Sequence, residues 1–183
     1  MDLQYPIGKF AWNRSGEGLL SSEAERQQWL ADIEAAPARL RATVAGLSEA
    51  QLDTPYRPGG WTVRQVVHHL ADSHMNAYVR FRLALTEEVP TIKPYEEKLW
   101  ANLSDACTAP AEISLTLLDA LHRRWVLLLR SQKPEGFARA MLHPELGRTT
   151  LEKYLALYAW HGKHHVAHIS GLRQRSGWTA PTA

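Results

Sequence analysis

The sequence has few of the features that mark disulfide-bonded or membrane proteins. It contains one cysteine, Cys107, which excludes an intramolecular disulfide and fits a reducing compartment. No apolar run approaches membrane-spanning length, and the first residues, Met-Asp-Leu-Gln-Tyr-Pro, lack the basic-then-apolar pattern of a signal peptide. We therefore expect a cytoplasmic protein with no membrane partner.

An excess of charge is also lacking. The net charge is +2 with histidines neutral, and no run of lysine and arginine forms a basic stripe, so we expect no nucleic-acid partner. The apolar fraction of 45% is ordinary for a soluble protein. A chain of 183 residues can bury a good core, and we expect a single domain over 1–183.

Several common catalytic motifs are missing. There is no His-Glu-x-x-His, no cysteine pair and no repeated Glu-x-x-His, which argues against carboxylate-bridged di-iron chemistry. The single Asp-x-x-His, Asp119–His122, is expected at the surface. Ser73 and Ser170 lack the strand–turn–helix context of a nucleophile elbow. Cys107 lies in a polar stretch without a basic neighbour, which gives it little weight as a nucleophile.

Helical periodicity dominates the rest of the chain. Ser21 and Ser22, followed by acidic residues, signal a helix start, Gly46 ends that helix, and Pro37 predicts a kink. No segment alternates convincingly as a strand, although a small hairpin fits within 132–149. Long helices are predicted over about 22–46, 62–87, 111–131 and 150–175, with a short one near 96–103 and an extended arm over 1–20. The expected fold is an all-α four-helix bundle.

Four histidines lie within eight residues of the last helix. Residues four apart share a helix face, so two pairs, His161/His165 and His164/His168, could each hold a metal. This face also carries apolar and aromatic residues and should point inward, whereas Glu152, Lys163, Ser170 and Arg173 fall on the other side. A lone inward histidine is most often a hydrogen-bonded core residue, but several on one stripe favour a metal site. The spacing does not choose between the two pairs.

A second histidine cluster, His68-His69, lies on the predicted helix 62–87. The residues sharing a face with His69 are polar: Gln65, Asp72, Ser73, Asn76 and Arg80. On one interpretation this is simply a solvated face. On the other it lines a cavity at one end of the bundle, with Asp72 or a nearby backbone carbonyl accepting the N–H of His69 and so orienting a metal-bound imidazole.

The segment from Gly59 to Asn76, GGWTVRQVVHHLADSHMN, resembles the DinB/YfiT superfamily, and its YfiT-like branch in particular. Further matches are YPIG at 5–8, QLDTPYR at 51–57, LHRRW at 121–125 and LYAWH at 157–161, which together span nearly the whole chain. The resemblance implies a four-helix bundle, a homodimer and one metal held by His69, His161 and His165. It leaves His68, His164 and His168 outside the ligand set.

The resemblance also implies an activity, either metal-dependent hydrolysis or transfer of a small thiol such as bacillithiol. Three histidine ligands leave coordination positions of the metal open, as in catalytic zinc sites. Nickel is a second possible metal. Such a site can activate water or a thiol toward a small-molecule electrophile, with Asp72 or Tyr158 as candidate assistants.

Three residues are candidates for substrate binding. Trp160 would contribute to an aromatic wall, together with Tyr154 and Tyr158, and Asn76 and Arg80 to a polar floor. Arg80 would hold an anionic group, or else close a surface ion pair. The alternative to an enzyme is a non-catalytic metal-binding bundle with a role in stress response. Detection of turnover would exclude this alternative. Trp12 and Trp100, if exposed, could cover a dimer partner.

Overall fold

The computed structural model describes residues 2–14 and 20–178, so part of the expected arm over 1–20 lies outside the described residues. Within these ranges, the long helices are α1 (Glu23–Val44), α3 (Val63–Thr86), α6 (Ala111–Arg130) and α8 (Leu151–Arg175). The short ones are α2 (Glu49–Leu52), α4 (Glu97–Trp100), α5 (Ser104–Thr108) and α7 (Pro134–Ala138). Strands β1 (Ala140–His143) and β2 (Gly147–Thr150) pair antiparallel, with Ala140 opposite Thr150. The all-α bundle is confirmed, with this small hairpin added.

Helix starts follow local side-chain chemistry. Ser22 caps α1 and Thr62 caps α3, and each forms a capping box with the residue three positions on, Glu25 and Gln65 respectively. These contacts satisfy backbone N–H groups that have no partner inside the helix, and each cap stabilises its helix by about 1 kcal/mol. The start of α3 therefore fixes where His69 falls on the bundle.

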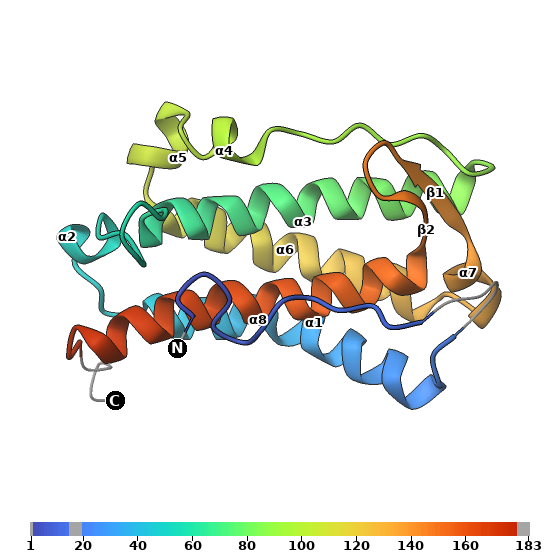
Figure 1. The fold of residues 1–183 in the computed structure, drawn as a ribbon, viewed down its shortest axis with the longest axis horizontal. Coiled ribbons are helices and arrows are strands. Elements are labelled where there is room, and N and C mark those ends of the chain that lie inside the picture. The colour runs from blue at the N-terminus through green and yellow to red at the C-terminus, as the bar shows by residue number, and fades with distance from the viewer. Residues whose placement is uncertain (1, 15–19, 179–183) are drawn as a thin grey trace.

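The four long helices pack in pairs, α1 with α8 and α3 with α6, and contacts of α1 with α6 and α3 with α8 close the bundle (Figure 1). Two apolar clusters form its core. The first meets α8 over 151–159 and contains Trp125, while the second meets α8 at Ile169 and Leu172. The histidine-rich stretch 161–168 thus lies between two apolar layers, with His164, His165 and His168 buried.

Two segments cover the bundle beside this stretch. The N-terminal arm runs along α8, with Phe10 against Trp160 and Tyr5 against His164 (Figure 1). On the other side, α4 and α5 pack on α3. Cys107 lies in α5, although the sequence predicts a loop at this position. In residues 2–14 and 20–178, no helix combines the length and apolar character needed to cross a bilayer.

Candidate metal centre

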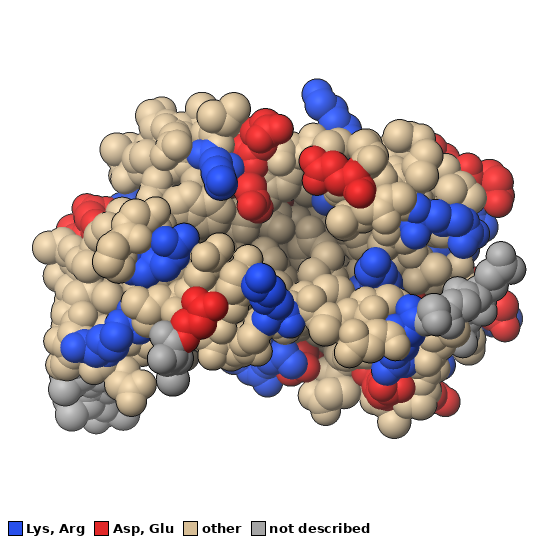
Figure 2. All heavy atoms as spheres, viewed as in Figure 1, with Lys and Arg blue, Asp and Glu red and all other residues tan. Residues whose placement is uncertain are grey.

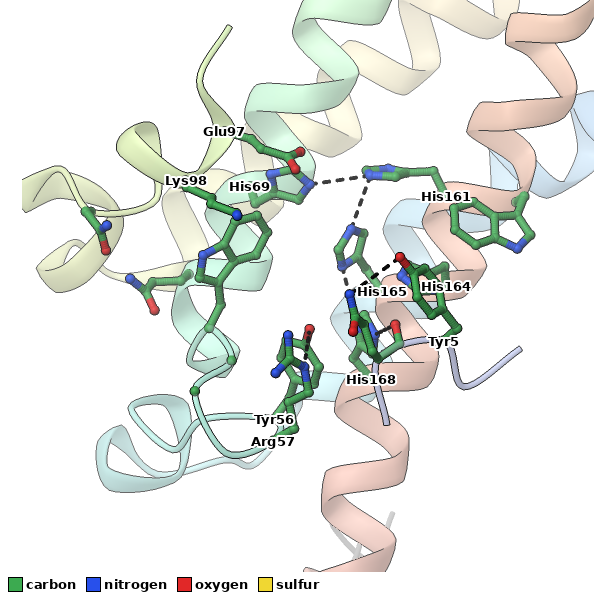
Figure 3. A pocket seen from close by; sticks show the side chains of 17 residues that line it. Tyr5, Tyr56, Arg57, His69, Glu97, Lys98, His161, His164, His165 and His168 are labelled. Carbon is green, nitrogen blue, oxygen red and sulfur yellow. Dashed lines mark hydrogen bonds between the residues drawn. The ribbon is translucent and has the colours of Figure 1, made fainter. Parts of the chain in front are cut away.

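Three histidines converge from two helices at the middle of the bundle. His69 comes from α3, and His161 and His165 come from successive turns of α8 (Figure 3). The Nε2 atom of His161 lies 3.4 Å from that of His69 and 3.1 Å from that of His165. His69 is 4% exposed and His165 7% exposed. The solvated-face interpretation of His69 therefore does not describe this molecule.

Burial keeps these imidazoles neutral. Desolvation lowers the pKa of His69 to about 3 and holds the pKa values of His161 and His165 well below the usual range, because the neighbouring rings add further positive charge when protonated. Nitrogen lone pairs of neutral imidazole are metal ligands. The donor atoms of the three rings all lie within 4.8 Å of one another, which suits a single metal ion.

A second triplet, His164, His165 and His168, also brings its nitrogens within 4.8 Å. Its rings are held by other contacts. His164 stacks on Trp160 at 4.3 Å between ring centroids, and His168 stacks on Tyr56 at 4.0 Å. The two triplets share His165 and differ in whether α3 contributes a ligand.

A pocket of about 670 Å³ opens over both triplets. Its aromatic lining comes from Tyr56, Trp61 and Trp160, and Trp61 lies 4.6 Å from His69 between ring centroids. Figure 2 shows the hollow on this face of the molecule, with charged side chains of both signs around it. The volume is in the range that accommodates small-molecule ligands, roughly 300–1,000 Å³.

Charged residues at the pocket were not predicted from the sequence. Glu97 is the only carboxylate among the described residues that line it, and its side chain points inward toward the histidines (Figure 3). Desolvation raises the pKa of Glu97. Arg57 and Lys98 line the same pocket. The signal that could have drawn attention to Arg57 is its place in the loop before Gly59-Gly60-Trp61, part of the family motif.

The loop carrying Trp61 depends on its glycines. Gly59 has φ +66°, a left-handed conformation that side chains disfavour. At Gly60 an added Cβ would lie 2.8 Å from Cγ of Arg57 and 3.1 Å from Cε1 of Tyr56. The backbone of Tyr56 donates to the carbonyl of Trp61 at 3.0 Å, which closes the loop beside the histidines.

The other predicted site residues lie at varying distance from this pocket. Trp160 lines it, whereas Asn76 lines a neighbouring cavity, and its amide donates to the backbone carbonyl of Asp72 at 2.9 Å. Within the described residues, no hydrogen bond joins Asp72 to His69. Burial raises the pKa of Asp72 to about 6.

Arg80 and Tyr158 belong to the buried interior. Arg80 donates to the Tyr154 hydroxyl at 3.3 Å and to the Lys93 carbonyl at 3.1 Å. Among the described residues it does not line the pocket and forms no ion pair. The Tyr158 ring lies 5.5 Å from that of His161, and burial raises the pKa of its hydroxyl to about 12.

Two further histidines, His122 on α6 and His68 on α3, are buried outside the three converging rings. His122 was expected at the surface but is only 1% exposed, because its Nδ1 lies 2.7 Å from the Ile33 carbonyl in the core between α1 and α6. That expectation was wrong. His68 contacts Ser114 Oγ at 2.7 Å and the Ala109 carbonyl at 3.1 Å, so both its ring nitrogens are satisfied away from the three converging histidines.

These features define a class: four-helix bundles with a histidine cluster between the apolar layers. Residues 32–169 match the sequence profile of the DinB superfamily, and the chain belongs to that family. A protein of Bacillus cereus (strain B4264) named "Putative metal-dependent hydrolase" is 52% identical over 177 residues, covering 97% of this chain and 99% of that one. A protein of the same name from Bacillus mycoides (strain KBAB4) is 51% identical over the same length.

Solved structures agree on the architecture. YfiT from Bacillus subtilis, described as "a probable metal-dependent hydrolase with an unusual four-helix bundle topology", matches with a TM-score of 0.92 and 49% identity over 98% of this chain and 100% of that one. TT2238, a four-helix bundle protein, matches with a TM-score of 0.54 and 23% identity, covering 77% and 94% of the two chains, which supports the fold alone. The resemblance seen in the sequence is confirmed.

Proposed function

We propose that this protein is a metal-dependent hydrolase in which His69, His161 and His165 hold one divalent metal ion, zinc in preference to nickel. The observation that carries the proposal is the convergence of three neutral imidazoles on one point, with Nε2 atoms 3.1 and 3.4 Å apart. His69 and His165 are buried and His161 is half-buried. A neutral imidazole can donate only one N–H to a neighbouring ring, whereas a single metal ion can take the lone pairs of all three nitrogens at once. The names of the relatives support the coarser assignment, a metal-dependent hydrolase.

Three protein ligands leave room for a water or substrate, as catalytic zinc sites require. A metal held there supplies a Lewis acid that lowers the pKa of water or a thiol and polarises a substrate carbonyl. The protein supplies the rest of the site. The aromatic walls exclude bulk water, and Trp61 holds the ring of His69 in place.

Glu97 is our candidate general base. It takes the proton from the attacking water, and returns it to the leaving group as the substrate bond breaks, so that the carboxylate is restored. A raised pKa suits both steps, because a base works best when its pKa lies nearer the working pH. Tyr158 and Asp72, considered from the sequence, stay as secondary candidates; Tyr158 is buried beneath His161.

A thiol transferase is the second candidate. The observation that favours it is the pair of cations at the pocket, Arg57 and Lys98. Arg57 donates to the Tyr56 hydroxyl and the Pro58 carbonyl, and among the described residues no carboxylate pairs with it. A guanidinium that pairs with no carboxylate among the described residues can bind the carboxylate of an anionic thiol. In this reaction the thiol passes its proton to Glu97 and its sulfur bonds the electrophilic carbon. The bond from that carbon to its leaving group breaks, and the leaving group takes the proton from Glu97.

The test is to purify the protein, measure bound metals by mass spectrometry, and assay a panel of esters and amides beside thiol consumption with small electrophiles. We expect one metal per chain and metal-dependent turnover. His165→Ala should strip most of the metal, while His68→Gln, a buried histidine outside the site, should keep it. Product that forms only with added thiol would select the transferase. A loaded protein without turnover in either assay would leave a non-catalytic metal-binding bundle.

A further inference from the structure

A chain of two buried histidines, His122 and His74, leads from a backbone carbonyl to His161. Nδ1 of His122 lies 2.7 Å from the Ile33 carbonyl, Nε2 of His122 lies 2.7 Å from Nδ1 of His74, and Nε2 of His74 lies 3.1 Å from Nδ1 of His161. His74 is fully buried and comes from α3, while His122 comes from α6. Every ring nitrogen of His74 and His122 is therefore engaged.

The carbonyl fixes the direction of this chain. A carbonyl oxygen only accepts, so His122 must carry its proton on Nδ1. A neutral imidazole has one N–H, which leaves Nε2 of His122 as an acceptor for the Nδ1–H of His74. By the same rule, Nε2 of His74 accepts the Nδ1–H of His161. The Nε2 atom of His161 is then left with its lone pair, facing His69 and His165.

A second, shorter chain acts on His165. Nε2 of His168 lies 3.1 Å from the backbone carbonyl of Gln4 in the N-terminal arm, and Nδ1 of His168 lies 3.3 Å from Nδ1 of His165 (Figure 3). The carbonyl requires the proton of His168 on Nε2, so its Nδ1 accepts from Nδ1–H of His165. The lone pair of His165 is again left on Nε2.

We propose that His74, with His122 behind it, and His168 are positioning residues that fix the tautomers of the two α8 ligands from the Ile33 and Gln4 carbonyls. The inference rests on the proposed metal site, and it explains why both ligands present Nε2. Partners of this kind orient a ligand ring and raise its basicity. Neighbouring histidines fill this role for His161 and His165. Asp72 was suggested from the sequence for a different ligand, His69.

The same arrangement accounts for the second histidine triplet. Both ring nitrogens of His168 are engaged, Nδ1 with His165 and Nε2 with the Gln4 carbonyl. A metal held by His164, His165 and His168 would therefore have to displace one of these two contacts. In our proposal His168 supports the site and is not a ligand.

The tautomers can be read without metal. In metal-free protein labelled with 15N-histidine, two-bond 15N–1H correlation spectra identify which ring nitrogen carries the proton. We expect Nδ1–H at His161, His165, His74 and His122, and Nε2–H at His168. Nε2–H at His161 and His165 in the folded protein would overturn the proposal.

Variants test the effect on the metal. His74→Leu and His168→Leu should each weaken zinc affinity, measured by competition with a chelator, by roughly 10–100-fold. His74→Gln, whose amide oxygen can accept from His161, should recover much of the loss. His68→Leu is the matched control, because it removes a buried histidine of α3 that touches none of the ligands. Unchanged affinity in folded His74→Leu and His168→Leu would overturn the proposal.

Failure of the proposed function gives a different pattern. A wild-type protein that binds no zinc would reject the metal enzyme, and the spectra of the metal-free protein alone would then decide the tautomer chains. A wild-type protein that binds zinc with the opposite tautomers would keep the metal site and reject the chains. The spectra need no variant, so poor folding of a substituted protein does not obscure the result.

Discussion

Glutamine at position 97 would keep the size of the side chain and remove the pocket's carboxylate. Since Glu97 is our candidate base, we expect Glu97→Gln to lower kcat by roughly 10²–10⁴-fold with little change in zinc affinity. In the wild type, activity should fall as the pH drops through the raised pKa of Glu97, because only the carboxylate accepts a proton. The measurement is a pH–rate profile of both proteins. Equal kcat and an unchanged acidic limb would reject the role, and Glu96→Gln is the exposed neighbouring control.

His122 makes stability depend on pH. Its pKa falls from 6.5 to about 4 through burial, so below pH 6.5 the unfolded chain binds a proton that the folded protein does not. Stability from this residue is full above pH 6.5 and declines toward pH 4 by about 1.4 kcal/mol per pH unit. Denaturant unfolding measures the free energy of unfolding at each pH across this range. Its slope against pH should be smaller in His122→Gln than in the wild type, by the amount that corresponds to one bound proton. Identical slopes would contradict the assignment.

The residue pattern alone predicted the histidine-rich face, its helical pairs and the nearby Trp160, but not the charged residues of the pocket. The i/i+4 spacing is a local property, whereas Glu97 reaches the histidines only because the segment between α3 and α6 folds back over α3. His74 and His122 were missed for a similar reason. Their partners lie on other helices or in the backbone, which no spacing rule along one segment reveals.

Glu152 ties the start of α1 to the start of α8. Its carboxylate is fully buried and accepts from the backbone N–H groups of Leu20 and Ser21 and from the Ser21 hydroxyl, with Arg26 3.9 Å away. We expect Glu152→Ala to lower the free energy of unfolding by about 3–5 kcal/mol, since it leaves several buried polar groups without a partner. Chemical denaturation measures this.

The matched control for this element is Glu23→Ala, an exposed acidic residue in the first turn of α1, which should cost less than about 1 kcal/mol. Equal effects of the two substitutions would show that the anchor contributes little.

Long helices were predicted closely from the sequence. Of the short ones only α4 was predicted, as the short helix near 96–103. Caps and periodicity marked α1, α3, α6 and α8 to within a few residues. Helices of four or five residues, such as α2 and α7, are too short to show a period. Helical projection also placed Glu152 on the polar side of α8. The structure buries it because the chain before α1 crosses that face, a tertiary effect outside any one helix.

At the scale of the whole molecule, we propose a homodimer. Trp12 and Trp100, the residues considered first, are half-buried against Trp29 and Tyr95. A better candidate surface is the outer face of α6, where exposed apolar residues recur at helical spacing: Ile113, Leu117 and Leu127. Exposed apolar rows of this kind are typical of interaction sites.

Sedimentation at micromolar concentration should give twice the chain mass, and Leu117→Glu should shift it toward the monomer. Leu99→Glu, at an exposed leucine away from α6, should not. A wild-type monomer would contradict the dimer.

The central claim is that one metal binds at the three converging histidines. The most direct measurement is an anomalous difference map from crystals of the zinc-loaded protein, collected at the zinc edge. We predict one peak per chain, bonded to Nε2 of His69, His161 and His165 at about 2.0–2.1 Å. A peak among His164, His165 and His168, or no peak within the histidine cluster, would contradict the account.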